Sequence, residues 1–136
     1  MTGKWIGQYT YGDTYPEPIK GTSINFNIEC LDLDGVISGN FTDDETKDVF
    51  NTPGTFNGFI DNNFISFIKK YPCYWDIIEN GEIRTIEDFP SQEIHYSGNL
   101  IDGHFEGDWE MSVTYKFEDG HTEQYDSSGT WKMFKN

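Results

Sequence analysis

The chain has 136 residues and a mass of 15.7 kDa, which corresponds to a single domain of ordinary size. Aromatic residues make up 17% of it, a density that excludes a disordered acidic segment. With 9 basic and 24 acidic residues the formal net charge is −15, and Arg84 is the single arginine. This charge excludes binding to nucleic acids or to anionic membrane surfaces, and no apolar run approaches the roughly 20 residues of a membrane span.

The two cysteines, Cys30 and Cys73, lie far apart and have no neighbours at a metal-ligand spacing. We therefore expect reduced thiols, no metal site and no cofactor. The first amphipathic strand begins at Gly3, close behind the first methionine, which predicts a cytoplasmic protein. A leader removed earlier would leave no trace in the sequence, so a secreted protein with a disulfide is the alternative.

Alternation of apolar and polar residues with a period of two predicts strands along most of the chain. The alternation is clearest in 24–30 and 105–117, and no segment repeats its apolar residues at helical spacing. We expect strands at 3–11, 22–33, 36–43, 54–61, 64–71, 93–101, 104–118 and 122–135. Antiparallel pairing of sequence neighbours then predicts an all-β, up-and-down meander that forms one barrel domain over residues 1–136.

The segment 72–92 is too rich in apolar residues for a free loop. Asn80-Gly81 predicts a hairpin turn near its centre. Three arrangements are compatible with this pattern: a lid over the mouth of an eight-stranded barrel, two further strands that extend the wall to ten, or a face for another copy of the chain.

Asp-Gly and Asn-Asn pairs between the strands predict tight hairpin turns. A two-residue turn at Asp102-Gly103 brings apolar residues opposite each other in one consistent register. At 119–121 the apolar residues agree only if the turn has three residues. This turn pairs Trp109 with Trp131 and places Gly120 in the left-handed region.

Glycine and bulky residues recur at alternate positions of several strands, first in Gly3-Lys4-Trp5-Ile6-Gly7. Inward glycines permit strong coiling, which favours a closed barrel over a flat sandwich. Gly3-Lys4-Trp5 on a first strand resembles the G-x-W signature of lipocalins, and the eight-strand meander resembles the calycins, which also include avidins and fatty-acid-binding proteins. The resemblance implies a barrel that holds a small hydrophobic molecule. The sequence lacks the second lipocalin signature, T-D-Y, and an arginine near the C-terminus, whose place over Trp5 would fall to Lys132 or Lys135.

The predicted interior combines plain apolar rings with hydroxyl- and sulfur-bearing side chains, as in a cup that holds a small apolar or aromatic ligand. We expect Trp5, Trp109 and Trp131 to fill the floor and the mouth to lie toward Tyr11, Cys30 and Tyr115. The candidate ligand-binding side chains are Tyr9, Tyr11, Ile28, Phe41, Phe67, Lys69, Tyr96, Met111, Tyr115 and Tyr125.

Lys69 is the most informative charge, because the run 64–71 is apolar on both faces. A two-residue turn at Asn62-Asn63 directs Lys69 into the barrel, where it would face an anionic head group of a ligand. A three-residue turn leaves Lys69 in water. Lysine is almost never fully buried without a partner, which favours the exposed arrangement.

The sequence contains none of the known nucleophile, metal or phosphate-binding motifs, so we predict no catalytic residue. The first hypothesis is non-catalytic binding of a small hydrophobic or aromatic ligand, with or without an anionic head group. The second is an interaction module with a filled core that forms a homodimer through 72–92. The third is an isomerase- or cyclase-like enzyme, which an interior ionisable group with a strongly shifted pKa would favour.

Overall fold

The computed structural model describes residues 1–78 and 80–136, and the side chain of Tyr115 lies outside this description. The strands are β1 (Gly3–Tyr11), β2 (Ser23–Leu33), β3 (Val36–Asp43), β4 (Gly54–Asp61), β5 (Phe64–Lys70), β6 (Tyr74–Ile77), β7 (Ile83–Ile86), β8 (Ile94–Ile101), β9 (His104–Lys116) and β10 (Thr122–Lys135). Within the described ranges there is no helix with the length and apolar character needed to cross a bilayer.

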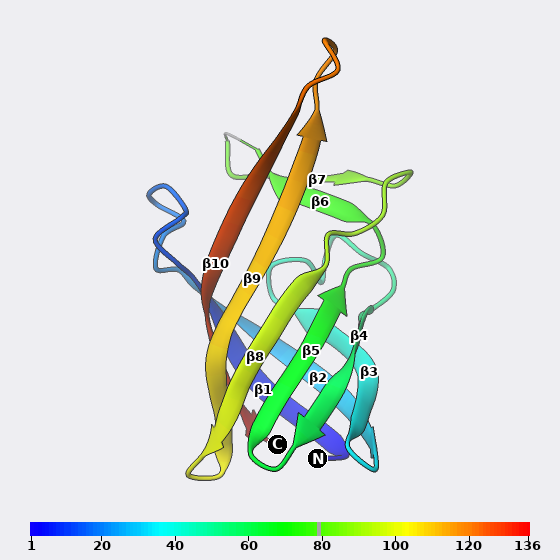
Figure 1. Cartoon of the computed structure of the whole chain (residues 1–136), viewed down its shortest axis with the longest axis vertical. Coiled ribbons are helices and arrows are strands. Elements are labelled where there is room, and N and C mark those ends of the chain that lie inside the picture. The colour runs from blue at the N-terminus through cyan, green and yellow to red at the C-terminus, as the bar shows by residue number, and fades with distance from the viewer. Residues whose placement is uncertain (79) are drawn as a thin grey trace.

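Eight of these strands form a closed antiparallel barrel in the order β1-β10-β9-β8-β5-β4-β3-β2 (Figure 1). Within the barrel, strands that are consecutive in the sequence pair with each other, and two further pairs join β5 to β8 across the intervening hairpin and β1 to β10. Closure comes from β1, which pairs with β2 on one side and with β10 on the other. The prediction of an all-β, up-and-down, eight-stranded barrel is confirmed, and a flat sandwich is excluded.

The predicted tight turns set most of the register. Asp34, Asn62 and Asp102 adopt positive φ angles of 55°, 53° and 51°, as hairpin turns of this kind require. Asp61 pairs with Phe64, so the turn at 62–63 has two residues. The inward face of β5 therefore carries its alternate residues Ile65, Phe67 and Lys69, all of which are buried.

The register between β9 and β10 differs from the prediction by two residues. Trp131 lies opposite Gly107, and Gly129 lies opposite Trp109. The turn lies one residue earlier than predicted, because the Phe117 N–H donates to the His121 carbonyl at 2.9 Å, although Gly120 has the predicted positive φ of 89°. A shift of two residues keeps every side chain on the same face, so alternation alone cannot detect it.

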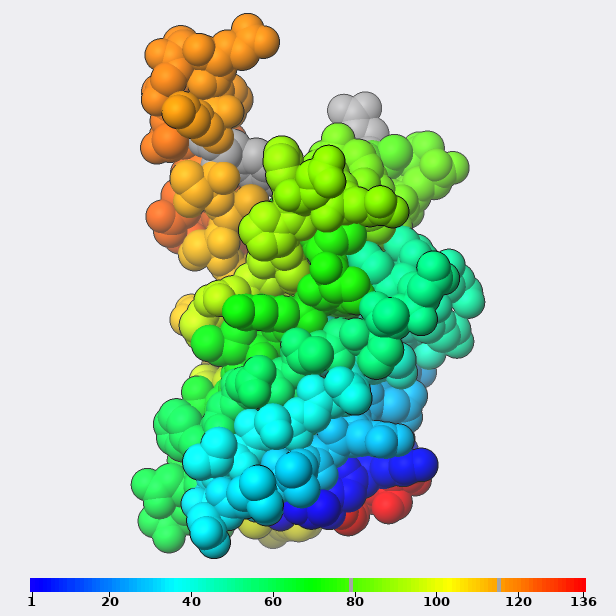
Figure 2. All heavy atoms as spheres, turned by 90° about the vertical axis from the view of Figure 1, so that its right-hand side faces the viewer, coloured from blue at the N-terminus to red at the C-terminus, as the bar shows by residue number. Residues whose placement is uncertain are grey.

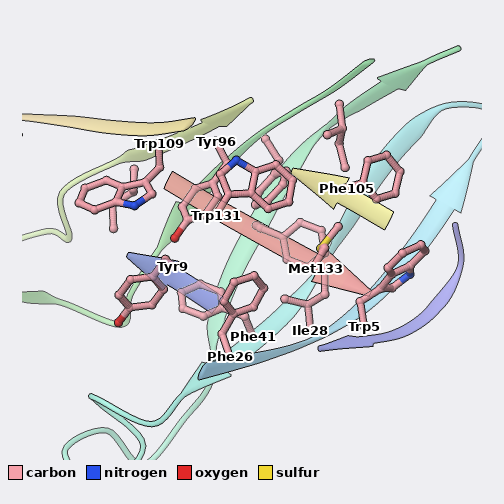
Figure 3. Close-up of a cluster of buried hydrophobic side chains, with 14 of the residues drawn as sticks. Trp5, Tyr9, Phe26, Ile28, Phe41, Tyr96, Phe105, Trp109, Trp131 and Met133 are labelled. Carbon is pink, nitrogen blue, oxygen red and sulfur yellow. The ribbon is translucent and has the colours of Figure 1, made fainter. Parts of the chain in front are cut away.

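Aromatic side chains fill the closed half of the barrel (Figure 3). Trp5 packs against Phe105 at a centroid separation of 5.3 Å, and the Trp131 N–H donates to the Ser97 carbonyl at 3.0 Å. Trp109 lies nearer the open end than predicted, beside Tyr9 (Figure 3). The expected floor therefore consists of two of the three tryptophans.

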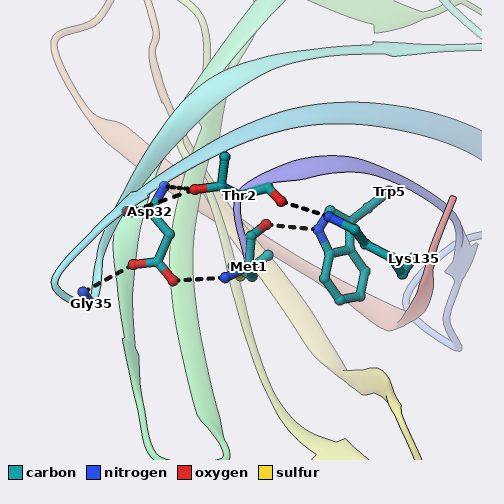
Figure 4. Close-up of polar contacts among 6 residues, drawn as sticks. All are labelled: Met1, Thr2, Trp5, Asp32, Gly35 and Lys135. Carbon is teal, nitrogen blue, oxygen red and sulfur yellow. Dashed lines mark hydrogen bonds and ion pairs between the residues drawn. The ribbon is translucent and has the colours of Figure 1, made fainter.

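The closed end is held by contacts around Trp5 (Figure 4). The Trp5 N–H donates to the Met1 carbonyl at 2.9 Å, and the Met1 amino group lies 2.8 Å from a carboxylate oxygen of Asp32. Lys135 Nζ lies 5.4 Å from the centroid of the Trp5 ring and donates to the Thr2 carbonyl at 2.6 Å. Lys135, rather than Lys132, thus supplies the predicted cation over Trp5.

Cys30 also lies at this closed end, because it pairs with Gly3. The expectation that Cys30 marks the mouth is therefore wrong. Both cysteines are free thiols and buried.

Two features extend beyond the open end of the barrel (Figures 1 and 2). Beyond Glu110, β9 no longer pairs with β8, and before Gly129, β10 no longer pairs with β1, so the two strands continue as a two-stranded ribbon. The strands β6 and β7 form a separate two-stranded sheet. The segment 72–92 therefore does not extend the barrel wall to ten strands.

Candidate functional site

A cavity of about 290 Å³ lies between the open end of the barrel and the β6–β7 hairpin. Its wall comes from β1, β6, β8 and β9, and from the segments after β1, before β6 and before β8. Aromatic side chains dominate the lining, among them Tyr9, Tyr11, Tyr15, Trp75, Tyr96 and Trp109. A concave site of this size with an apolar wall and few polar groups suits a small organic ligand.

The structure divides the predicted site residues into three groups. Tyr9, Tyr11, Tyr96 and Met111 line the cavity. The second group consists of Ile28, Phe41 and Phe67. These side chains are buried in the filled interior, and aromatic rings separate them from the cavity.

Tyr125 forms the third group and was predicted wrongly. Its side chain is 52% exposed, because it lies on the ribbon beyond the rim, where alternation no longer separates the inside of a barrel from the outside. The predicted site residue Tyr115 has its side chain outside the described part of the structure.

Several cavity residues were not in the predicted set. Tyr15 comes from the loop after β1, and Trp75 and Gln92 come from the 72–92 segment. Trp109 was assigned to the floor. The apolar character of 72–92 is a sequence signal for Trp75 but not for Tyr15 or Trp109, and periodicity cannot place a segment that lies outside the barrel wall.

Lys69 is fully buried beneath the cavity, with 0% of its side chain exposed. Its Nζ lies 3.9 to 5.4 Å from the centroids of four aromatic rings and donates to the Tyr96 hydroxyl at 3.3 Å. Among the described residues no carboxylate lies within ion-pair distance of this amine. Burial lowers the pKa of Lys69 to about 7, and the negative charge of Asp43 opposes part of that shift.

Asp43, at the end of β3, is the buried acid whose charge acts on Lys69, and it is already hydrogen-bonded. It accepts from the Tyr71 hydroxyl at 2.7 Å and from both the backbone N–H and the hydroxyl of Thr46, at 2.7 and 2.8 Å. These bonds satisfy a carboxylate that is 1% exposed.

Glu45 is a second acidic group, and it contacts two tyrosines that line the cavity. It accepts from the hydroxyls of Tyr9, at 2.7 Å, and Tyr11. Burial raises the pKa of Glu45 despite these two donors. Burial also raises the pKa of Tyr9, Tyr11 and Tyr96, so these phenols remain neutral hydrogen-bonding groups.

The sequence matches no protein-family model and no curated protein sequence at a significant level. A solved structure to which the fold is similar is that of rhizavidin, with a TM-score of 0.48 and 13% sequence identity over 96% of this chain and 83% of rhizavidin. The closed, antiparallel, up-and-down topology is the barrel architecture that the resemblance of the sequence to calycins implied.

Proposed function

We propose that the protein binds a small hydrophobic or aromatic molecule without chemical turnover, in the cavity between the barrel and the β6–β7 hairpin. The observation that carries the proposal is the contrast between the two ends of the barrel. Aromatic side chains pack the closed end, whereas at the open end similar side chains surround about 290 Å³ of space. A filled core without ligand would not leave an apolar wall around this space.

We further propose that the ligand carries an anionic head group directed toward Tyr96. The Tyr96 hydroxyl accepts from Lys69, so its own proton is available to an oxygen of the ligand. The ammonium group of Lys69 adds positive charge directly behind that hydroxyl. Asp43 and Glu45 accept from Tyr71, Tyr9 and Tyr11, so the protons of these three hydroxyls are already used, whereas the proton of Tyr96 is not.

The first test is native mass spectrometry of the purified chain, followed by titration with 2-naphthoic acid and with naphthalene, monitored by tryptophan fluorescence. We expect the acid to bind more tightly. Met111→Trp fills the cavity and should weaken binding at least tenfold. Thr114→Trp, on the outward face of the same strand, is the matched control and should bind as the natural chain does. Equal affinities for both variants would contradict the proposal.

The enzyme hypothesis is supported by one observation, the pKa of Lys69 near 7. Lys69 lies beneath the cavity wall and does not line the cavity, so the geometry supports binding better than turnover. The homodimer stays a prediction. The Trp75 ring, 7% exposed, packs against Tyr71 at 5.3 Å, so the largest side chain of the hairpin does not contribute to an outer face.

A further inference from the structure

The β6–β7 hairpin segment contributes four polar side chains to the cavity, Tyr74, Trp75 and Asp76 in β6 and Gln92 just before β8. The Asp76 carboxylate already accepts from the Tyr74 hydroxyl at 3.2 Å and from Arg84 Nε at 3.0 Å. The Trp75 indole stands edge-on to Tyr71, with 78° between the ring planes. Trp75 lies in the hairpin beyond the open end of the barrel (Figure 1), and Gln92 lies in the segment that leads from this hairpin into β8. They are therefore placed to contact the outer end of a bound molecule.

The Trp75 N–H and the Gln92 carbonyl oxygen are both buried and have no hydrogen-bond partner among the described residues. The other half of the Gln92 amide is bound, because its Nε2 donates to the Trp75 backbone carbonyl at 2.7 Å. That bond fixes the orientation of the amide, since rotation by 180° would place two carbonyl oxygens against each other. The segment thus presents one donor and one acceptor.

The other three tryptophans show that this chain normally satisfies a buried indole. Trp5 donates to the Met1 carbonyl at 2.9 Å, Trp109 to the Thr10 carbonyl at 3.2 Å and Trp131 to the Ser97 carbonyl at 3.0 Å. Trp75 is the exception, and it lines the cavity. An unpartnered buried donor lowers the stability of the free protein, so its position in a binding site calls for a functional explanation.

From this contrast we infer that Trp75 and Gln92 recognise a neutral polar group at the outer end of the ligand, one that both accepts and donates a hydrogen bond. A hydroxyl or a primary carboxamide has this chemistry. The inference rests on the proposed function. Together the two define the ligand class as an apolar or aromatic body with an acidic group toward Tyr96 and a hydroxyl or carboxamide toward the hairpin.

The test uses two probes that differ by one hydroxyl, 2-naphthoic acid and 6-hydroxy-2-naphthoic acid, titrated into the natural chain. We expect the hydroxylated probe to bind about fivefold to tenfold more tightly, the gain from newly satisfied hydrogen bonds. Trp75→Phe retains an aromatic ring without the N–H and should abolish that gain, so that the two probes bind the variant with equal affinity. Trp109→Phe is the matched control, because its N–H is already bound, and it should retain the gain.

Chemical shifts of the indole N–H protons test, in the natural chain, whether Trp75 donates to the hydroxyl of the probe. This measurement does not depend on the folding of a variant. The Trp75 signal should move with the hydroxylated probe much more than with 2-naphthoic acid. Equal affinities of the two probes for the natural chain, or an equal loss for both in Trp75→Phe, would overturn the inference and leave the proposed function standing. Failure of both probes to bind would overturn the proposed function as well.

Discussion

The Lys69 amine donates to the Tyr96 hydroxyl at 3.3 Å, at a point where the filled half of the barrel meets the cavity. Four aromatic rings surround the amine, and their π faces stabilise its charged form only in part. The pair joins a buried positive charge to the cavity wall through one hydroxyl. The electrostatic potential inside the cavity therefore depends on whether Lys69 is protonated.

Lys69→Met should stabilise the protein at neutral pH. The pKa of Lys69 is lowered from 10.5 to about 7 in the folded chain, so the unfolded chain binds more protons between these values. The free energy of unfolding of the natural chain should therefore rise with pH over that interval, and the variant should lose this rise. At pH 7 the variant should be more stable by up to roughly 4 kcal/mol.

Urea unfolding at pH 7.0 and 9.5 measures this difference. Lys70→Met is the control, because Lys70 is exposed and paired with Glu93 at 3.1 Å in water. It should change stability by less than about 1 kcal/mol at either pH. Parallel pH profiles for Lys69→Met and the natural chain would refute the assignment.

Asp43→Asn should lower the pKa of Lys69 below about 7, because the negative charge of Asp43 favours the protonated amine. The variant should also be destabilised, since Tyr71 and Thr46 donate to that carboxylate. A double-mutant cycle with Lys69→Met isolates the electrostatic part. We expect Asp43→Asn to cost less stability in the Lys69→Met background, and strict additivity would show that the two groups do not interact.

Gly129→Ala should destabilise the barrel by about 2 kcal/mol or more. A Cβ atom at Gly129 would lie 2.0 Å from the Thr10 carbonyl oxygen and 2.6 Å from the Trp109 ring, so backbone or indole must move. Ser128→Ala, on the exposed face next to it, is the control and should have little effect. Thermal unfolding measures both, and equal melting temperatures for the two variants would contradict the close packing described here.

Lys135→Met should destabilise the closed end by about 1 kcal/mol, through loss of the cation over Trp5 and of the hydrogen bond to Thr2. Lys132→Met removes a similar side chain from the exposed face of the same strand and should be close to neutral. Chemical denaturation distinguishes the two variants. A larger effect at Lys132 would show that the wrong lysine has been assigned.

Fold class followed from local patterns because each pattern has a single structural solution. Period-two alternation is satisfied only by strands with one buried face, and Asp-Gly or Asn-Asn pairs accept the positive φ of tight turns. Lys69 is a residue whose orientation such patterns cannot decide. Both faces of 64–71 are apolar, so only the pairing of Asp61 with Phe64 decided that Lys69 points inward. The general rule against buried lysines favoured the opposite answer.

The sequence by itself therefore determined an antiparallel barrel and most of its register, and it left open whether Lys132 or Lys135 lies over Trp5. Only the tertiary structure decided the two-residue shift between β9 and β10, the exposure of Tyr125 and the cavity beneath the hairpin. The physical reason is the separation along the chain of the residues involved. Alternation and turn chemistry act between residues close along the chain, whereas a cavity arises from side chains on segments that meet only after the barrel has closed.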